Sequence, residues 1–76
     1  MSLYQQLKAA GVPLSNHESD LYVKDTPEAV VILVANGKTP GAFGCERFRS
    51  RIDEAYWFDV PFMYDPYWEK RQAVKP

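Results

Sequence analysis

The chain has very few of the side chains that bind metals or form covalent links. Its 76 residues include one cysteine, Cys45, and one histidine, His17. A single cysteine excludes a disulfide within the chain, and one thiol with one imidazole cannot supply the four ligands of a structural zinc site. We therefore expect no metal and no cofactor, and a lone thiol suits a reducing compartment.

Long apolar runs are also missing. The longest run, residues 29–35, is far shorter than the roughly 20 residues that span a bilayer, and no charged-then-apolar leader stands at the start. Nine Lys and Arg are balanced by ten Asp and Glu, which argues against a polyanion-binding surface made by the whole molecule. These absences predict a cytoplasmic protein with no membrane partner, although a local basic patch remains open.

Aromatic residues are concentrated near the C-terminus. Seven of the eleven fall between Tyr56 and Trp68. Because each ring can bury about 150–250 Å² and a chain of this length has a marginal core, these rings either build the core or leave an exposed patch. We expect one small globular domain over residues 1–68 and a frayed tail over residues 69–76.

Two segments have helix signals at both ends. Ser2 and Gln5 have capping-box spacing, and Gly11 is placed to end the first helix. In the second segment, Thr26 and Pro27 are typical of a helix start, and a stop follows at Asn36. The β-branched residues between them would also suit a buried strand, but the matching caps favour a helix.

Three segments are predicted as strands. The first is residues 21–23, preceded by a polar loop, and residues 48–52 and 55–60 form a hairpin with Asp53 and Glu54 as its turn. This register places Ile52 opposite Ala55 and turns the face of Phe48 and Trp57 inward. Asp-Glu is a poor hairpin turn, so the register, and with it the exposed face, remains open.

The predicted fold class is α+β, in the order helix, strand, helix, strand, strand. Two short helices cover one face of a three-stranded, mostly antiparallel sheet. The expected core is Leu3, Leu7, Leu21, Val23, Val30, Leu33, Val34, Phe48, Ile52, Trp57 and Phe62.

The best candidate for a binding surface combines alternating arginines with neighbouring rings. Arg47, Arg49 and Arg51 would share one strand face, next to Tyr56 and Phe58. Cations and ring faces together can hold phosphate, carboxylate or an acidic protein patch, although a solvated strand face also alternates in this way. Exposed rings at Tyr67 and Trp68 would complete the partner-binding set.

No catalytic motif is present. His17 lies in a polar loop without a second histidine, and nothing in the sequence places it beside Cys45. We therefore predict a non-enzymatic interaction protein. A small nucleic-acid or nucleotide binder using the arginine and aromatic face, and a structural homodimer, are the alternatives.

Two stretches carry a resemblance. Residues 19–28, with the run from Ser19 to Val23 leading into Thr26-Pro27-Glu28, and residues 57–68 resemble segments of small uncharacterised proteins encoded by tailed phages and prophages. The resemblance implies a bacterial host cytoplasm and an accessory factor that binds and masks a host protein, for example in counter-defence. It assigns no functional residue.

Overall fold

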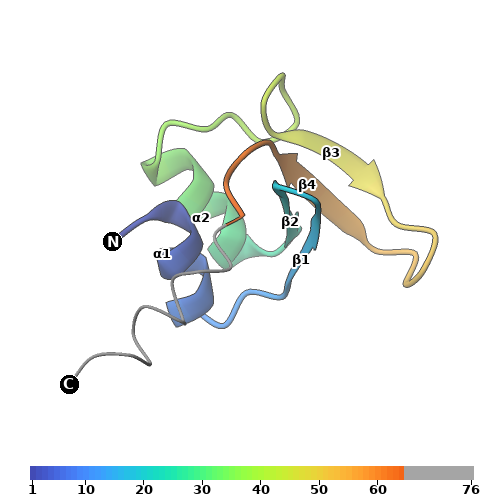
Figure 1. Cartoon of the computed structure of the whole chain (residues 1–76), viewed down its shortest axis with the longest axis horizontal. Coiled ribbons are helices and arrows are strands. Elements are labelled where there is room, and N and C mark those ends of the chain that lie inside the picture. The colour runs from blue at the N-terminus through green and yellow to red at the C-terminus, as the bar shows by residue number, and fades with distance from the viewer. Residues whose placement is uncertain (65–76) are drawn as a thin grey trace.

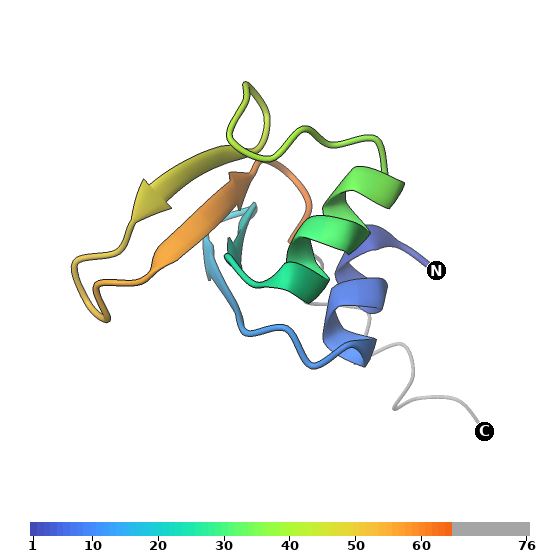
Figure 2. The same cartoon turned by 180° about the vertical axis from the view of Figure 1, so that it is seen from behind.

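The computed structural model describes residues 1–64, which form two layers, a pair of helices and an antiparallel sheet (Figure 1). The helices lie on one face of the sheet, and the hairpin formed by the last two strands extends beyond them in both views (Figures 1 and 2). In chain order the elements are α1 (Leu3–Ala9), β1 (Leu14–His17), β2 (Asp20–Lys24), α2 (Pro27–Ala35), β3 (Glu46–Arg49) and β4 (Tyr56–Val60). The predicted α+β class is therefore confirmed.

Both helices begin and end where their caps predict. The Ser2 hydroxyl accepts a hydrogen bond from the Gln5 N–H, and the Gln5 side chain accepts one from the Ser2 N–H, which completes the capping box of α1. Thr26 accepts from the Ala29 N–H at the start of α2. Gly37 follows α2 with a φ of 78°, a conformation that glycine adopts at little cost. Local capping thus overrides the β-branched composition of α2.

The sheet has four strands, not the three predicted, in the order β1-β2-β4-β3. The expected loop before Asp20 contains β1, which pairs antiparallel with β2 from Leu14 opposite Val23 to His17 opposite Asp20. Glu18 takes a positive φ of 54° in the two-residue turn. Because β1 is mostly polar, no apolar alternation marks it as a strand in the sequence. Backbone pairing with β2 is what makes it one.

The hairpin register differs from the prediction by two residues. Phe48 lies opposite Trp57, and the Ser50 N–H donates to the Ala55 carbonyl at 2.8 Å. The connection is therefore residues 51–54, wider than the Asp53-Glu54 turn expected. The Asp53 carboxylate accepts the Ala55 N–H and the Ser50 hydroxyl accepts the Ile52 N–H, so local side-chain bonds stabilise the wider loop.

The inward face of β4 is the opposite of the one predicted. Val23 lies opposite Phe58 and Leu21 opposite Val60, so Phe58 and Val60 join the apolar face of β2. Phe58 is 2% exposed. A shift of two residues preserves the faces, so the error came from assigning the hairpin without β2 beside it.

The core is built from both helices and the inner sheet face. Leu3, Leu7, Leu21, Val23 and Leu33 are buried as predicted, and Val30 packs against this cluster. Five members of the predicted core are wrong: Val34, Ile52 and Phe62 are exposed, and Phe48 and Trp57 lie on the outer sheet face. The buried apolar set is Leu3, Tyr4, Leu7, Val12, Leu21, Val23, Ala29, Leu33, Cys45, Phe58 and Val60.

One polar contact joins the two helices, and one aromatic contact joins α1 to the segment after β4. Gln6 of α1 and Asn36 after α2 exchange side-chain hydrogen bonds at 3.4 and 3.1 Å. The Tyr64 ring meets the Tyr4 ring edge to face at 5.9 Å, and its N–H donates to the Ser19 carbonyl. Within residues 1–64 no helix is long and apolar enough to cross a membrane.

Candidate functional site

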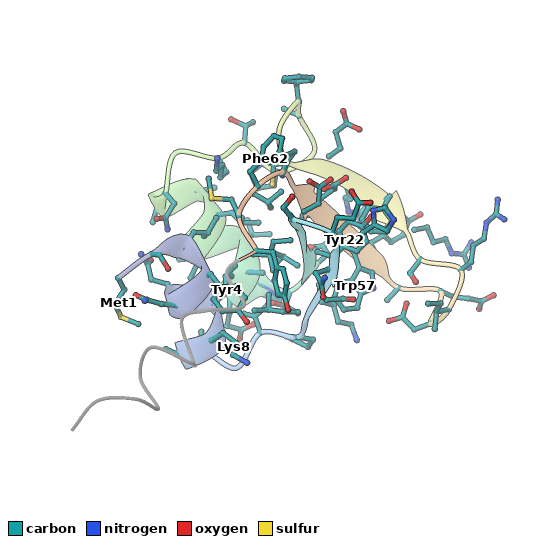
Figure 3. All side chains as sticks on the ribbon, viewed as in Figure 1. Met1, Tyr4, Lys8, Tyr22, Trp57 and Phe62 are labelled. Carbon is teal, nitrogen blue, oxygen red and sulfur yellow. The ribbon has the colours of Figure 1, made fainter. Side chains whose placement is uncertain are left out.

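The sheet face that the helices leave uncovered carries the most distinctive surface of the described residues. We call it the open face. By strand alternation it presents one row of side chains from each strand, and Figure 3 shows Tyr22 and Trp57 on the sheet, apart from Tyr4 and Lys8 of α1. The open face comprises Ser15, His17, Asp20, Tyr22, Lys24, Glu46, Phe48, Trp57 and Asp59.

Three aromatic rings gather at its centre. Tyr22 and Phe48 meet edge to face, with their centroids 5.0 Å apart and their planes at 64°. Trp57 lies directly opposite Phe48 in the ladder, and its indole N–H donates to both oxygens of Asp53 at 3.2 and 3.3 Å. Each ring is half-buried, so part of the apolar surface of all three remains accessible to a partner.

A hollow of about 570 Å³ is centred on these rings. Its walls come from β1 on one side and from β3 with the following turn on the other. Ile52, which is 97% exposed, stands at its rim. The lining residues are Ser15, Asn16, His17, Tyr22, Phe48, Arg49, Ser50, Arg51, Ile52, Asp53 and Trp57. Concave apolar surface with a few polar groups around it is typical of binding sites.

Carboxylates flank the rings at one end of the open face. Asp59 lies opposite Tyr22 on one side and Glu46 on the other, and Asp20 is on the same face. Burial raises the pKa of Asp59 above its ordinary value, and the nearby charge of Asp20, a hydrogen bond with Asp20 and the charge of Glu46 raise it further. Among residues 1–64 the buried Asp59 Oδ1 atom has no hydrogen-bond partner. This end of the face therefore has a negative potential.

The pKa of Asp53 is shifted in the opposite direction to that of Asp59. The Ala55 N–H, and then the Trp57 indole and the Ser50 hydroxyl, lower the pKa of this carboxyl. Hydrogen bonds to the charged form account for that direction. Asp53 thus stays ionised and orients the Trp57 ring at the wall of the hollow.

Of the three arginines predicted to share one strand face, Arg47 and Arg49 do so, whereas Arg51 lies in the turn after β3. The Arg47 Nε donates to Asp25 Oδ2 at 2.8 Å, and its guanidinium lies 3.7 Å from the centroid of the Tyr56 ring. Arg49 donates to the Glu54 carbonyl at 3.4 Å, and Arg51 stands exposed in the turn after β3. Arg47 and Arg49 belong to the same sheet face as Phe58, beyond the area that the helices cover.

The rings predicted as interface anchors have divided roles. Phe58 is in the core, so it cannot contact a partner, and the prediction for it is wrong. Tyr56 is exposed but lies against Arg47. Tyr67 and Trp68 lie outside the described residues, as does the tail expected over residues 69–76.

Tyr22, Phe48 and Trp57 were not predicted as a site. The alternation of Leu21 and Val23 with Tyr22 was the available signal, because it sets the outward side of β2.

A second apolar spot lies between two loops at the far end of β4. Phe43 and Phe62 are 98% and 82% exposed, and both line a hollow of about 390 Å³ with Lys38, Gly44, Glu46, Asp59 and Pro61. Phe62 has a positive φ of 62°, which costs a non-glycine residue about 1 kcal/mol.

The two candidate reactive residues lie in different surroundings. Cys45 is fully buried in the core, and burial raises the pKa of its thiol, which favours the unreactive protonated form. His17 is exposed on β1. Among residues 1–64 no group of three or more His, Cys, Asp or Glu side chains is arranged to hold a metal ion.

Comparisons with known proteins were negative at every level. No protein-family model matches the chain, no curated protein matches it in sequence, and no solved structure matches its fold.

Proposed function

We propose that this chain is a non-enzymatic interaction protein that binds a partner protein through the open face and masks it. One observation carries the proposal, the aromatic hollow of Tyr22, Phe48 and Trp57 on a sheet face that neither α1 nor α2 covers. The outer face of a two-layer antiparallel sheet is ordinarily polar. Rings in such a position are enriched in protein interfaces and lose little side-chain entropy on binding.

The exposed rim of the hollow supports the same proposal. Ile52 is almost fully exposed in the turn after β3, so packing within residues 1–64 does not account for an isoleucine there. A partner that covers Ile52 and the neighbouring rings would remove apolar area from water at about 25 cal/mol per Å². The polar groups around the hollow, such as Ser15 and Arg51, would then form the rim of the interface.

Electrostatics favours a protein partner over nucleic acid. Phosphates that approach the ring cluster would find Arg49 and Arg51 at one wall of the hollow, but they would also meet the carboxylates Asp20, Glu46 and Asp59 on the same sheet face. Arg47, one of the three arginines in the sequence-based hypothesis, is already paired with Asp25 on the other sheet face. Bases could stack on the rings, but the backbone would be repelled, and backbone charge dominates affinity for nucleic acid.

A matched pair of variants tests the surface without disturbing the fold. Ile52→Ser removes apolar area at the rim, whereas Val31→Ser makes a comparable change at an exposed position of α2. Tagged wild type and both variants are used to capture proteins from a bacterial lysate, and each captured protein is then titrated into ¹⁵N-labelled chain. The proposal expects one partner whose affinity falls about tenfold in Ile52→Ser only, with a shift of the Trp57 indole signal.

Other outcomes would overturn the proposal. The open face is not the binding site if Ile52→Ser and Val31→Ser lose affinity equally, or if the captured partner does not shift the Trp57 indole signal. Salt-sensitive binding of labelled single-stranded DNA would favour the nucleic-acid alternative. A concentration-independent dimer in sedimentation, lost in Ile52→Ser, would favour the homodimer. That the partner belongs to a phage-infected bacterium rests on the sequence resemblance alone, and the comparisons add nothing to it.

A further inference from the structure

The outer edge of β3 is a free strand edge that borders the hollow. Antiparallel ladders alternate between residues that bond to the neighbouring strand and residues that point away from it. The bond from the Ser50 N–H to the Ala55 carbonyl places Ser50, Phe48 and Glu46 on the side of β4. The N–H and C=O groups of Arg47 and Arg49 therefore point to the free edge, which no other strand of residues 1–64 occupies.

The side chains of this edge are strongly asymmetric. Arg47 and Arg49 lie on the inner side of β3, with 45% and 60% of their side chains exposed, because the hairpin extends past the helices (Figure 2). Phe48 lies on the other side, on the open face. An added strand would place residues directly opposite Arg47 and Arg49 on the arginine side, and its alternate residues next to Phe48 and the hollow.

We propose that β3 accepts an extended acidic segment of the partner protein as a fifth strand. The segment has acidic residues at alternate positions, one facing Arg49, the more exposed of the two arginines, and the next lying beside Arg47, which keeps its ion pair with Asp25. Apolar residues between them pack beside Phe48. Charge complementarity selects this occupant, since opposite charges across a strand pair are favourable and like charges are not. This inference rests on the proposed function, whose partner it describes more closely.

The same charges argue against the other occupants of this edge. A second copy paired through β3 would set Arg47 and Arg49 of the two chains against each other, which like-charge repulsion disfavours. The opposite edge, β1, carries no charged residue, so it offers no comparable selection. The Asn16 side chain on that edge already donates to the Glu18 carbonyl.

A synthetic peptide tests the edge directly. The probe is a capped octapeptide of alternating glutamate and valine, with a lysine and valine octapeptide as its charge-reversed control, titrated into the ¹⁵N-labelled full chain. We expect the Arg47 and Arg49 amide signals to shift and their hydrogen exchange to slow with the glutamate peptide. Arg49→Glu should weaken this binding about fivefold and strengthen binding of the lysine peptide, because an exposed ion pair contributes up to about 1 kcal/mol.

Lys8→Glu is the matched control, because it makes the same charge change on α1, away from β3 (Figure 3), and should leave the affinity unchanged. The inference is overturned if the glutamate peptide does not bind at millimolar concentration, if both peptides bind equally well, or if the shifts fall on β1. If the glutamate peptide does not bind at β3 but Ile52→Ser still weakens binding of the captured partner, the proposed function stands and only the strand-edge inference is lost. If the glutamate peptide binds at β3 but Ile52→Ser has no effect on partner binding, the β3 edge stands as a binding site and the open face does not.

Discussion

Tyr22 and Phe48 contact each other across a strand that belongs to neither of them. Tyr22 is in β2 and Phe48 in β3, and β4 lies between these strands, yet the two rings meet at a centroid distance of 5.0 Å. Two strand spacings amount to about 9.6 Å, so only large side chains can meet over β4. The contact makes a continuous aromatic surface from three strands, and it covers β4 beside Asp59.

Asp59 is expected to lower stability at neutral pH. Its pKa is raised in the folded chain, so the folded state binds this proton more tightly than the unfolded state. The free energy of unfolding from this group is therefore highest below the ordinary aspartate pKa, and falls as pH rises through the raised value. Asp59→Asn should increase stability at pH 7 by about 1 kcal/mol, since it removes a charge that is raised in free energy by burial and by the neighbouring carboxylates Asp20 and Glu46.

Thermal unfolding of wild type and Asp59→Asn between pH 3 and pH 8 measures this effect. The variant should have the higher Tm at pH 7, by roughly 4–8 °C for a domain of this size. The gap should narrow below about pH 4, where both side chains are neutral. A gap that is constant across the range would mean that packing, and not ionisation, separates the two proteins.

Arg47 is expected to act mainly in the fold. Its ion pair with Asp25 and its stacking on Tyr56 join the segment after β2 to the β3–β4 hairpin. Arg47→Ala should lower the free energy of unfolding by about 1–2 kcal/mol. Arg51→Ala is the control, because Arg51 is exposed in the turn, and should change it by less than about 0.5 kcal/mol. Urea unfolding measures the free energy of unfolding of both variants. Equal losses in Arg47→Ala and Arg51→Ala would contradict a structural role for Arg47.

Phe58 and Phe62 should differ sharply although both belong to the aromatic-rich segment. Phe58 is buried against the helices, and Phe58→Ala should cost about 3–5 kcal/mol of folding free energy. Phe62 is exposed with a positive φ, so Phe62→Gly should stabilise the chain by up to about 1 kcal/mol. Denaturant midpoints of the two variants test this, and a destabilised Phe62→Gly would reveal a packing role for that ring.

Cys45 should be unreactive in the folded chain. The thiol is enclosed in the core and its pKa is raised by burial, so both access and thiolate formation are suppressed. Reaction with a chromogenic disulfide reagent at pH 8 should be far slower than in denaturant and should follow the opening of the fold. Rapid labelling under native conditions would show that the core around Cys45 opens easily.

Local signals in the sequence determined the helices. Ser2 with Gln5, and Thr26 with Pro27, act through hydrogen bonds within one turn of the chain, so they predict the start of each helix without knowledge of the rest. The inward side of β2 is equally local, because Leu21 and Val23 alternate with polar or amphipathic neighbours. These features needed no long-range information, and the structure confirmed them.

Only the tertiary structure decided the fourth strand, the outward direction of Trp57 and Phe48, and the separate roles of the arginines. β1 exists because β2 offers it a hydrogen-bonding edge, and β4 turns Phe58 inward because β2 lies beside it. Strand alternation gives two possible faces for any hairpin, and a single strand cannot say which of them the helices will cover. The open face and its aromatic hollow follow from that long-range choice, which is why the candidate site could not be found from local sequence patterns.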